Sequence, residues 1–344
     1  MSRRGNAPTL EDVAAEAGVS RATVSRVVNA DLRVSPRARE RVQAAISELG
    51  YAPNRAARAL VTRQADSIAV VIPESDARVF SDPFFAGTLH GVATALAKTD
   101  LQMVLVMGQP DDDLGRMDRY LRGGHTDGAI ITSHHRRDEF WHAAQASGLP
   151  VVFLGRPFVP VPGMPYVDMD NAHGAALAVK HLLEQGRTRI ATIAGPSDMV
   201  AGADRLAGWR REMRAAGLRD DAVVHGDFTT AGGAAGMAKL LASHPDIDGV
   251  FVASDVMAVA AIGTLLQHGL SVPDDVSVVG FDNTDAAIEA TPALTSIVNP
   301  IVPMARQAVG LLLGLLDGDE VPAAVTLSTE IVVRSSSVPA DRQR

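Results

Sequence analysis

The sequence predicts two structural parts, a small all-α N-terminal domain and a larger α/β domain built as two lobes. Residues 1–65 contain 11 Arg, no Lys and six acidic residues, giving a net charge of +5, whereas the rest of the chain carries −13. Short helical patterns fill the basic part, and apolar runs alternate with helical patterns in the acidic part. A chain of 344 residues, 47% of them hydrophobic, is long enough to bury a core in each part.

The composition excludes several classes of protein. The chain has no Cys, which excludes disulfides and thiolate metal sites. No apolar run reaches the roughly 18 residues that a membrane-spanning helix needs. The first residues lead into a polar helix rather than an apolar signal core. We therefore expect a cytoplasmic protein with no membrane partner.

Residues 10–29 predict two short helices joined by a tight turn. Thr9 followed by Asp12 has the spacing of a capping box, and Gly18 ends the first helix. Ser20 can cap the second helix, whose outer face carries Arg and Ser side chains. This helix-turn-helix geometry can place the second helix in the major groove of DNA. From this pattern alone, an ordinary helical hairpin is the alternative.

A third helix is predicted between residues 35 and 50, and the N-terminal region as a whole resembles a known family. Residues 10–60 resemble the DNA-binding headpiece of the lactose-repressor (LacI/GalR) family of transcription factors. The matching segments are DVA at 12–14, AGVS at 17–20, TVSRVVN at 23–29, LGY at 49–51 and PNR at 53–55.

This resemblance implies that particular side chains bind double-stranded DNA. Base contacts are expected from Arg21, Ala22 and Arg26, because an Arg fork pairs with guanine and a methyl group contacts the thymine methyl. Hydroxyl and amide groups suit phosphate oxygens, although they also suit helix capping. The expected phosphate contacts are Thr9, Thr23, Ser25 and Asn29.

Residues 53–65 resemble the hinge helix and linker of the same family. A helix of about eight residues is too short to be stable alone in water, so it should form only against DNA and a partner copy. The resemblance implies contacts with the minor groove from Asn54, Ala57 and Leu60. Leu60 would act as an apolar wedge at the central base step, unless it packs against its own domain.

Residues 66–337 alternate between short apolar runs and helical patterns. This alternation predicts parallel sheets covered by helices on both faces, and about ten strands suggest two lobes. The resemblance extends to this region and implies a two-lobed periplasmic-binding-protein-like (type I) fold. The clearest apolar runs are 68–72, 103–106, 129–131, 151–154, 190–193, 250–252 and 276–279.

The resemblance also implies where the parts begin and end. It predicts a helix-turn-helix headpiece at 1–52, a hinge at 53–65, an effector-binding and dimerisation domain at 66–337 and a flexible tail at 338–344. The first lobe would comprise about 66–164 and 296–324, and the second about 165–295 and 325–337.

Ligands of such lobes bind at the carboxyl ends of the strands. The resemblance implies an effector clamp of Asp282, Arg205 and Phe228. A carboxylate and a guanidinium can each bind adjacent sugar hydroxyls, and an aromatic ring can cover the apolar face of a sugar. The alternatives are a salt bridge between the two charges and core packing of the ring. Further candidates are Phe84, Phe85, Ser133, Arg156, Met199, Ser254 and Asp255.

Three other observations limit the kind of ligand and the list of candidate residues. Met199 and Ala201 are apolar where purine-responsive relatives use polar groups, which favours a sugar over a nucleobase. His134 and His135 have no further ligand at metal spacing, so we expect a solvated loop rather than a metal site. Two of the further candidates have an alternative to ligand binding: one of the paired residues Phe84 and Phe85 can belong to the core instead, and Asp255 can cap a helix.

The sequence therefore predicts a ligand-responsive transcriptional regulator. We expect a homodimer that represses carbohydrate-utilisation genes, binds a near-palindromic operator and is released by a mono- or disaccharide. The C-terminal tail has no leucine heptads that could join two dimers, so a dimer is preferred over a tetramer. No cofactor or catalytic motif is evident, which disfavours an α/β enzyme. A sugar-transport receptor is also disfavoured, because such a protein would be exported and would not need the basic N-terminal region.

Overall fold

The computed structural model describes residues 8–28, 33–51, 64–108, 115–138 and 141–338. Asn29 and the predicted hinge residues Asn54, Ala57 and Leu60 lie outside these ranges. The chain forms two compact units, Met1–Ala65 and Asp66–Arg344. Within the described ranges, no helix is both long enough and apolar enough to cross a lipid bilayer.

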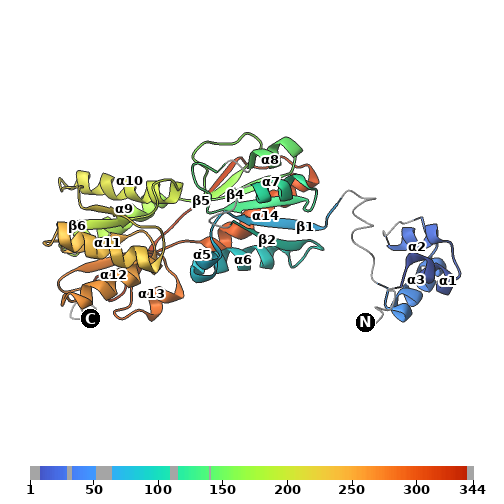
Figure 1. The fold of residues 1–344 in the computed structure, drawn as a ribbon, viewed down its shortest axis with the longest axis horizontal. Helices are drawn as coiled ribbons and strands as arrows, with labels where there is room; N and C mark the ends of the chain where they lie inside the picture. The colour runs from blue at the N-terminus through green and yellow to red at the C-terminus, as the bar shows by residue number, and fades with distance from the viewer. Residues whose placement is uncertain (1–7, 29–32, 52–63, 109–114, 139–140, 339–344) are drawn as a thin grey trace. The chain divides into compact units, whose positions relative to one another are not determined.

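The N-terminal unit contains the three predicted helices (Figure 1). They are α1 (Leu10–Ala17), α2 (Arg21–Val28) and α3 (Pro36–Leu49). Gly18 and Gly50 end α1 and α3 in the left-handed conformation, with φ of 59° and 60°, which glycine adopts without steric cost. One fully buried valine from each helix, Val13, Val24 and Val42, forms the centre of a small core.

Two six-stranded sheets form the larger unit, one in each lobe. The first sheet has the strand order β11-β5-β4-β3-β1-β2, and all its neighbouring strands are parallel. Its strands are β1 (Ser67–Ile72), β2 (Gln102–Met107), β3 (Gly128–Thr132), β4 (Val151–Leu154), β5 (Tyr166–Met169) and β11 (Ala324–Leu327).

The second sheet has the order β12-β10-β9-β8-β6-β7, in which only the pairing of β12 with β10 is antiparallel. Its strands are β6 (Ile190–Ala194), β7 (Val223–His225), β8 (Gly249–Val252), β9 (Ser277–Asp282), β10 (Thr295–Val298) and β12 (Ile331–Val332).

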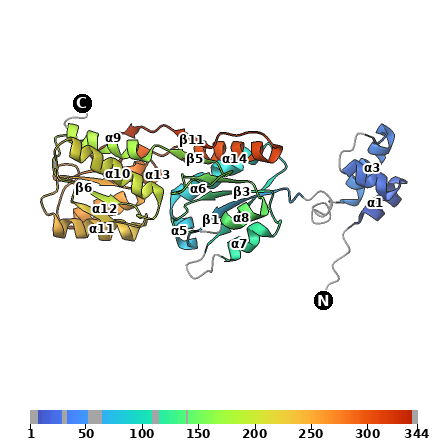
Figure 2. The same cartoon turned by 90° about the horizontal axis from the view of Figure 1, so that it is seen from above.

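Helices cover both faces of each sheet, as the nearly continuous apolar strands predict. Along β1, Ile68 and Val70 share a core with α6 and α14, whereas Ala69 and Val71 face α7 and α8. Figure 2 shows α14 and α7 on opposite sides of this sheet. The first-lobe helices are α5 (Asp76–Ser81), α6 (Pro83–Leu96), α7 (Gly115–Arg122), α8 (Trp141–Ser147) and α14 (Ile301–Asp317).

The second lobe repeats this arrangement. Helices α9 and α10 pack together on one face of its sheet, and α11 and α12 pack together on the other. The helices are α9 (Asn171–Glu184), α10 (Val200–Ala215), α11 (Thr230–Ser243), α12 (Asp255–Gln267) and α13 (Asp285–Glu289).

The chain passes between the lobes a few residues later than the sequence predicts. β5 belongs to the first sheet, although residues from 165 onward were expected in the second lobe. Likewise, β10 belongs to the second sheet and β11 to the first. The chain therefore crosses between the lobes after β10 and again after β11, rather than before these strands. The three strands are only four residues long and contain polar residues, so no continuous apolar run identifies them.

Candidate functional site

The outer face of α2 carries the side chains predicted to contact bases. Arg21, Ala22 and Arg26 are all exposed, and their spacing places them on one side of the helix. The Arg21 Nε atom lies 2.9 Å from Glu11 Oε1, and both side chains are more than half exposed. An exposed pair of this kind contributes little to stability, so Arg21 can exchange it for a base contact at small cost.

The predicted phosphate-contacting hydroxyls have local partners in the free headpiece. Thr9 Oγ1 donates to Asp12 Oδ2 over 2.7 Å, and Asp12 accepts a further bond from the Thr9 backbone N–H, which lowers the pKa of this carboxyl. The Thr23 hydroxyl lies 2.9 Å from Ser20 Oγ at hydrogen-bonding distance, and the Thr23 backbone N–H donates to the same Ser20 Oγ over 3.1 Å. Thr9 therefore caps α1, and Thr23 and Ser25 lie half-buried on α2. Phosphate binding by these residues stays a prediction.

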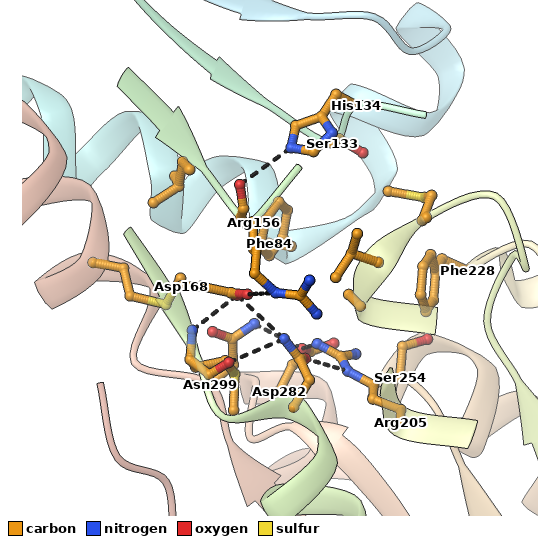
Figure 3. Close-up of a pocket in the computed structure, with 18 of the residues that line it drawn as sticks. Phe84, Ser133, His134, Arg156, Asp168, Arg205, Phe228, Ser254, Asp282 and Asn299 are labelled. Atoms are coloured by element: carbon orange, nitrogen blue, oxygen red, sulfur yellow. Dashed lines mark hydrogen bonds and ion pairs between the residues drawn. The ribbon is translucent and has the colours of Figure 1, made fainter. Parts of the chain in front are cut away.

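A cavity lies between the two lobes, at the carboxyl ends of strands from both sheets (Figure 3). Open parallel sheets bind ligands at this edge. Eight of the predicted effector residues line it, namely Phe84, Ser133, Arg156, Met199, Arg205, Phe228, Ser254 and Asp282.

Asp282, at the end of β9, is the central acidic group of the cavity. Its side chain is 12% exposed, its Oδ1 accepts from Asn299 Nδ2 over 3.0 Å, and Arg205 Nη2 lies 3.6 Å away. Burial raises the pKa of Asp282 to about 7; the Arg205 charge opposes this rise and the neighbouring carboxyls of Asp255 and Asp82 add to it. The group can therefore change charge near neutral pH.

Arg205 is held in place by its protein partners. It projects from α10, donates from Nε to Asn171 Oδ1 over 2.9 Å and from Nη1 to the Ala253 carbonyl over 2.6 Å. Its guanidinium also stacks on Phe281, 3.6 Å from the ring centroid. These contacts fix the guanidinium plane, and Nη2 remains beside Asp282 as a donor for a ligand.

Arg156 and Asp168 contribute charges from the first lobe. Arg156 Nη2 donates to Asp204 Oδ2 on α10 over 2.6 Å, so this ion pair joins the lobes, and Nε lies 4.0 Å from Asp168 Oδ2. Burial is the main cause that raises the pKa of Asp168 to about 6, while Arg156 opposes the rise. Figure 3 shows Arg156, Asp168, Asp282 and Arg205 gathered in one part of the cavity.

Aromatic rings and strained backbone complete the cavity wall. Phe84 is half-buried at the start of α6, and Phe228 is 6% exposed ahead of α11. Among the described residues, five non-glycine residues have positive φ, and three of them line the cavity: Ser133 (55°), Phe228 (61°) and Asp282 (109°). Residues held in this region of backbone space cluster at ligand sites, which supports a binding role for this cavity.

Two predicted effector residues do not line the cavity. Phe85 is fully buried in the core that α6 shares with α14, because successive residues of a helix point in different directions from its axis. Asp255 is also fully buried, and its carboxylate accepts from the Thr284 backbone N–H over 2.7 Å and from Ser296 Oγ over 2.6 Å. Asp255 thus supports the loop that follows Asp282 rather than facing a ligand.

Several residues that line the cavity were not predicted from the sequence. Asp168 and Asn299 lie at the ends of β5 and β10, whose short runs gave no clear strand pattern. His134 was expected in a solvated loop but is 6% exposed, and its Nε2 lies 3.1 Å from the Gly155 carbonyl. Burial lowers the pKa of His134 to about 4. The others are Arg78, Asp82, Leu154, Gly155, Met169, Asn171, Val200 and Met304.

The charges of the cavity are largely balanced within the protein. Each of the three lining arginines has a carboxylate neighbour: Glu74 for Arg78, Asp204 for Arg156 and Asp282 for Arg205. A strongly anionic ligand would have to break these pairs, whereas a neutral polyhydroxylated ligand can use their remaining donors and acceptors. In the part of the chain that the structure describes, no group of three or more acidic or His side chains could hold a metal ion.

Comparisons with known proteins identify both parts of the chain. Residues 9–54 match the model of bacterial regulatory proteins of the lacI family, and residues 179–337 match that of periplasmic binding protein-like domains. The HTH-type transcriptional regulator CelR of Thermobifida fusca is 46% identical over 98% of this chain and all of its own. The HTH-type transcriptional repressor CytR of Escherichia coli (strain K12) is 32% identical over 97% of this chain and 98% of its own.

Two solved structures cover nearly the whole chain. A transcriptional regulator CelR–cellobiose complex has a TM-score of 0.77 and 44% identity over 96% of this chain and 100% of that chain. A Lac repressor dimer bound to operator and the anti-inducer ONPF has a TM-score of 0.86 and 29% identity over 97% of this chain and 100% of that chain.

Proposed function

Because the chain belongs to the lacI family of bacterial regulatory proteins and is a DNA-binding transcriptional regulator, not an enzyme, we propose that it is a carbohydrate-responsive repressor. It acts as a homodimer in the cytoplasm. Two copies of α2 read the two halves of a near-palindromic operator, and paired hinge segments contact its centre. A sugar in the interlobe cavity releases the operator.

The proposed effector class rests on the side chains that line the cavity. Their charges are largely balanced within the protein, and they offer groups that can bind hydroxyls. Asp282, Arg205 and Asn299 offer adjacent acceptors and donors, and Phe84 and Phe228 offer apolar ring faces. Hydroxyl groups and flat C–H faces are the two surfaces of a pyranose ring. Since a CelR chain that is 44% identical to this one has been solved in complex with cellobiose, we propose a β-linked glucose disaccharide as the effector of this chain.

The mechanism follows from the two-lobed architecture. A ligand between the lobes contacts residues of both, so it favours one lobe arrangement over another. The hinge segments precede β1 of the first lobe, and a short helix is too weak to form without support. The ligand therefore changes operator affinity by changing how well two hinge segments can pair on DNA.

Effector and operator binding can be measured separately on the full-length protein. An operator is first selected from a random double-stranded library, and its affinity is measured by fluorescence anisotropy with and without each ligand. Cellobiose is expected to bind by calorimetry and to weaken operator binding at least tenfold, within the usual range of allosteric coupling. Cytidine and guanine are expected to have no effect, because Met199 and Ala201 offer no polar side chain to a base. Glucose 6-phosphate is expected to have none because each lining arginine is already paired with a carboxylate.

Asp282→Asn tests the clamp, and Asp285→Asn is its matched control, since Asp285 is an exposed acidic residue three positions later. Loss of a charged hydrogen-bond acceptor should raise the Kd for cellobiose about 100-fold in Asp282→Asn and leave operator affinity unchanged. Asp285→Asn should behave as the wild type. Tight binding of a nucleoside, or no response of operator binding to any neutral sugar, would contradict the proposed effector class.

A further inference from the structure

A polar cluster outside the cavity joins the two lobes. It consists of Glu74, which follows β1, His135, which follows β3, and Asp198, which precedes α10 in the second lobe. His135 Nε2 lies 3.1 Å from Glu74 Oε1, and His135 Nδ1 lies 2.9 Å from Asp198 Oδ2. A backbone hydrogen bond from Arg136 N–H to the Asp198 carbonyl, 2.7 Å long, runs beside it.

The geometry of this cluster requires a charged imidazole. Both ring nitrogens face carboxylate oxygens, so both must carry a proton if both are to donate. A neutral ring would turn a lone pair toward one of the carboxylates. The two contacts accordingly raise the pKa of His135 to about 9, with burial opposing the rise.

Neighbouring groups hold the three side chains in position. Glu74 is mostly buried, accepts from Ser133 Oγ over 2.7 Å and pairs with Arg78 on α5. The His135 backbone N–H donates to Asp138 Oδ2 over 2.6 Å, which fixes the turn that carries the ring. His134, the neighbouring imidazole on this turn, is buried and neutral because burial lowers its pKa to about 4. Arg136 and Arg137, which follow His135 on the turn, are exposed.

The cluster lies next to the cavity without forming its wall. Ser133 and His134 line the cavity on the first-lobe side, and Met199 lines it on the second-lobe side. His135 and Asp198 are the adjacent residues in the chain but are not among the lining residues. A change at either position therefore alters the junction between the lobes without removing a ligand contact.

We propose that Glu74, His135 and Asp198 form a polar clasp that holds the lobes closed over the cavity and slows release of the effector. Glu74 and His135 belong to the first lobe and Asp198 to the second, so separating the lobes exposes more of the His135 ring to water. It also breaks the ion pair and the backbone hydrogen bond from Arg136 to Asp198. The inference rests on the proposed function only for its ligand-release measurement.

Lobe separation can be measured without any ligand. Because the chain has no Cys, Ala146→Cys on α8 and Ala215→Cys on α10, both exposed, provide one spin label in each lobe. Labelled protein diluted with excess unlabelled protein reports the distance within one chain by double electron–electron resonance. His135→Ala and Asp198→Asn should shift or broaden the distance distribution, His135→Arg should restore it, and the exposed control His173→Ala should leave it unchanged.

Two further measurements test the origin of the effect. At pH 10 the wild-type distribution should approach that of His135→Ala, because His135, with a pKa raised to about 9, is charged below that pH and neutral above it. The distribution of His135→Arg should not change, because arginine stays charged at this pH. With cellobiose as the probe, the dissociation rate constant should rise about tenfold in His135→Ala and Asp198→Asn. Distance distributions that are the same in the wild type and both clasp variants would overturn the clasp, whether or not cellobiose binds.

Discussion

Asp282 combines three properties that single it out at the scale of one residue. It is nearly buried, its φ is 109°, and burial raises its pKa to about 7. Its backbone strain is maintained by the hydrogen bond from Asn299 and by the loop that Asp255 holds through Thr284. The carboxyl that faces the cavity is thus rigidly placed but not permanently charged.

We predict that effector affinity rises with pH because of this residue. The ionised carboxylate accepts stronger hydrogen bonds from sugar hydroxyls than the protonated acid does, so binding favours loss of the proton from Asp282. The Kd for cellobiose should fall about tenfold between pH 5.5 and 7.5 and then level off, since one released proton gives up to a tenfold change per pH unit below the pKa.

Calorimetry in buffers of different ionisation enthalpy would measure this proton release directly. Asp282→Asn should bind more weakly and show a much flatter profile, while Asp285→Asn should keep the wild-type slope. An equal slope in Asp282→Asn would assign the titration to another group, of which Asp168, with a pKa of about 6, is the nearest candidate.

At the scale of one element, α2 separates core residues from DNA-facing residues. Val24 is fully buried against α1 and α3, whereas Arg21, Ala22 and Arg26 are exposed. Eight residues are too few for a stable isolated helix, so the buried valine and the capping turn at Ser20 hold α2 in place. The exposed positions can therefore vary with the operator sequence at little cost to the headpiece.

Replacing Arg21 should reduce sequence discrimination more than general DNA affinity. A bidentate Arg–guanine contact is worth roughly 1–3 kcal/mol, so Arg21→Ala should weaken binding to the selected operator by about 5- to 150-fold. Binding to random duplex should fall much less. Arg37→Ala removes the same charge from the exposed first turn of α3 and should leave the ratio of specific to random binding near the wild-type value. Competition binding at fixed salt measures both ratios.

The predicted hinge segment gives a second prediction at this scale. Leu60→Ala should weaken operator binding and reduce operator bending, because a methyl group cannot wedge open a base step as the leucine side chain can. Effector binding by calorimetry should not change. A gel-shift titration with circularly permuted operator fragments reports affinity and bending together, and unaltered values of both would remove Leu60 from the DNA interface.

At the scale of the whole molecule, the charge distribution and the two-lobed fold serve different partners. Residues 1–65, the headpiece with its hinge, carry +5 and suit a polyanion, while the remainder carries −13 and leaves DNA binding to this N-terminal part. Arg156 with Asp204 and the clasp residues are contacts between the lobes of one chain. Ligand control of DNA binding is therefore a property of the whole chain rather than of the cavity alone.

The assembly state is predicted to be a dimer. Sedimentation equilibrium at micromolar concentration should give twice the mass of one chain, since the C-terminal tail has no leucine heptads to join two dimers. The mass should be the same for Leu60→Ala, because the hinge is predicted to pair only on DNA. A mass of four chains would contradict this prediction, and a monomer would require DNA to assemble the repressor.

The sequence by itself determined the elements whose signals are local. Two kinds of local signal located the three headpiece helices and seven of the twelve described strands. They are the helix caps, at Thr9, Ser35 and Gly18, and apolar periodicity over a few residues. The headpiece motifs also lie within short segments, and they led to the lacI family. The resemblance to that family then implied Asp282 as an effector-binding residue.

Only the tertiary structure decided which side chains meet. Asp168 and Asn299 are 131 positions apart in the chain, yet both line one cavity because β5 and β10 end at the same junction between the sheets. The helical register alone sends Phe85 into the core and Phe84 to the cavity. The contact of His135 with both lobes depends on sheet order and lobe closure, which no local pattern encodes.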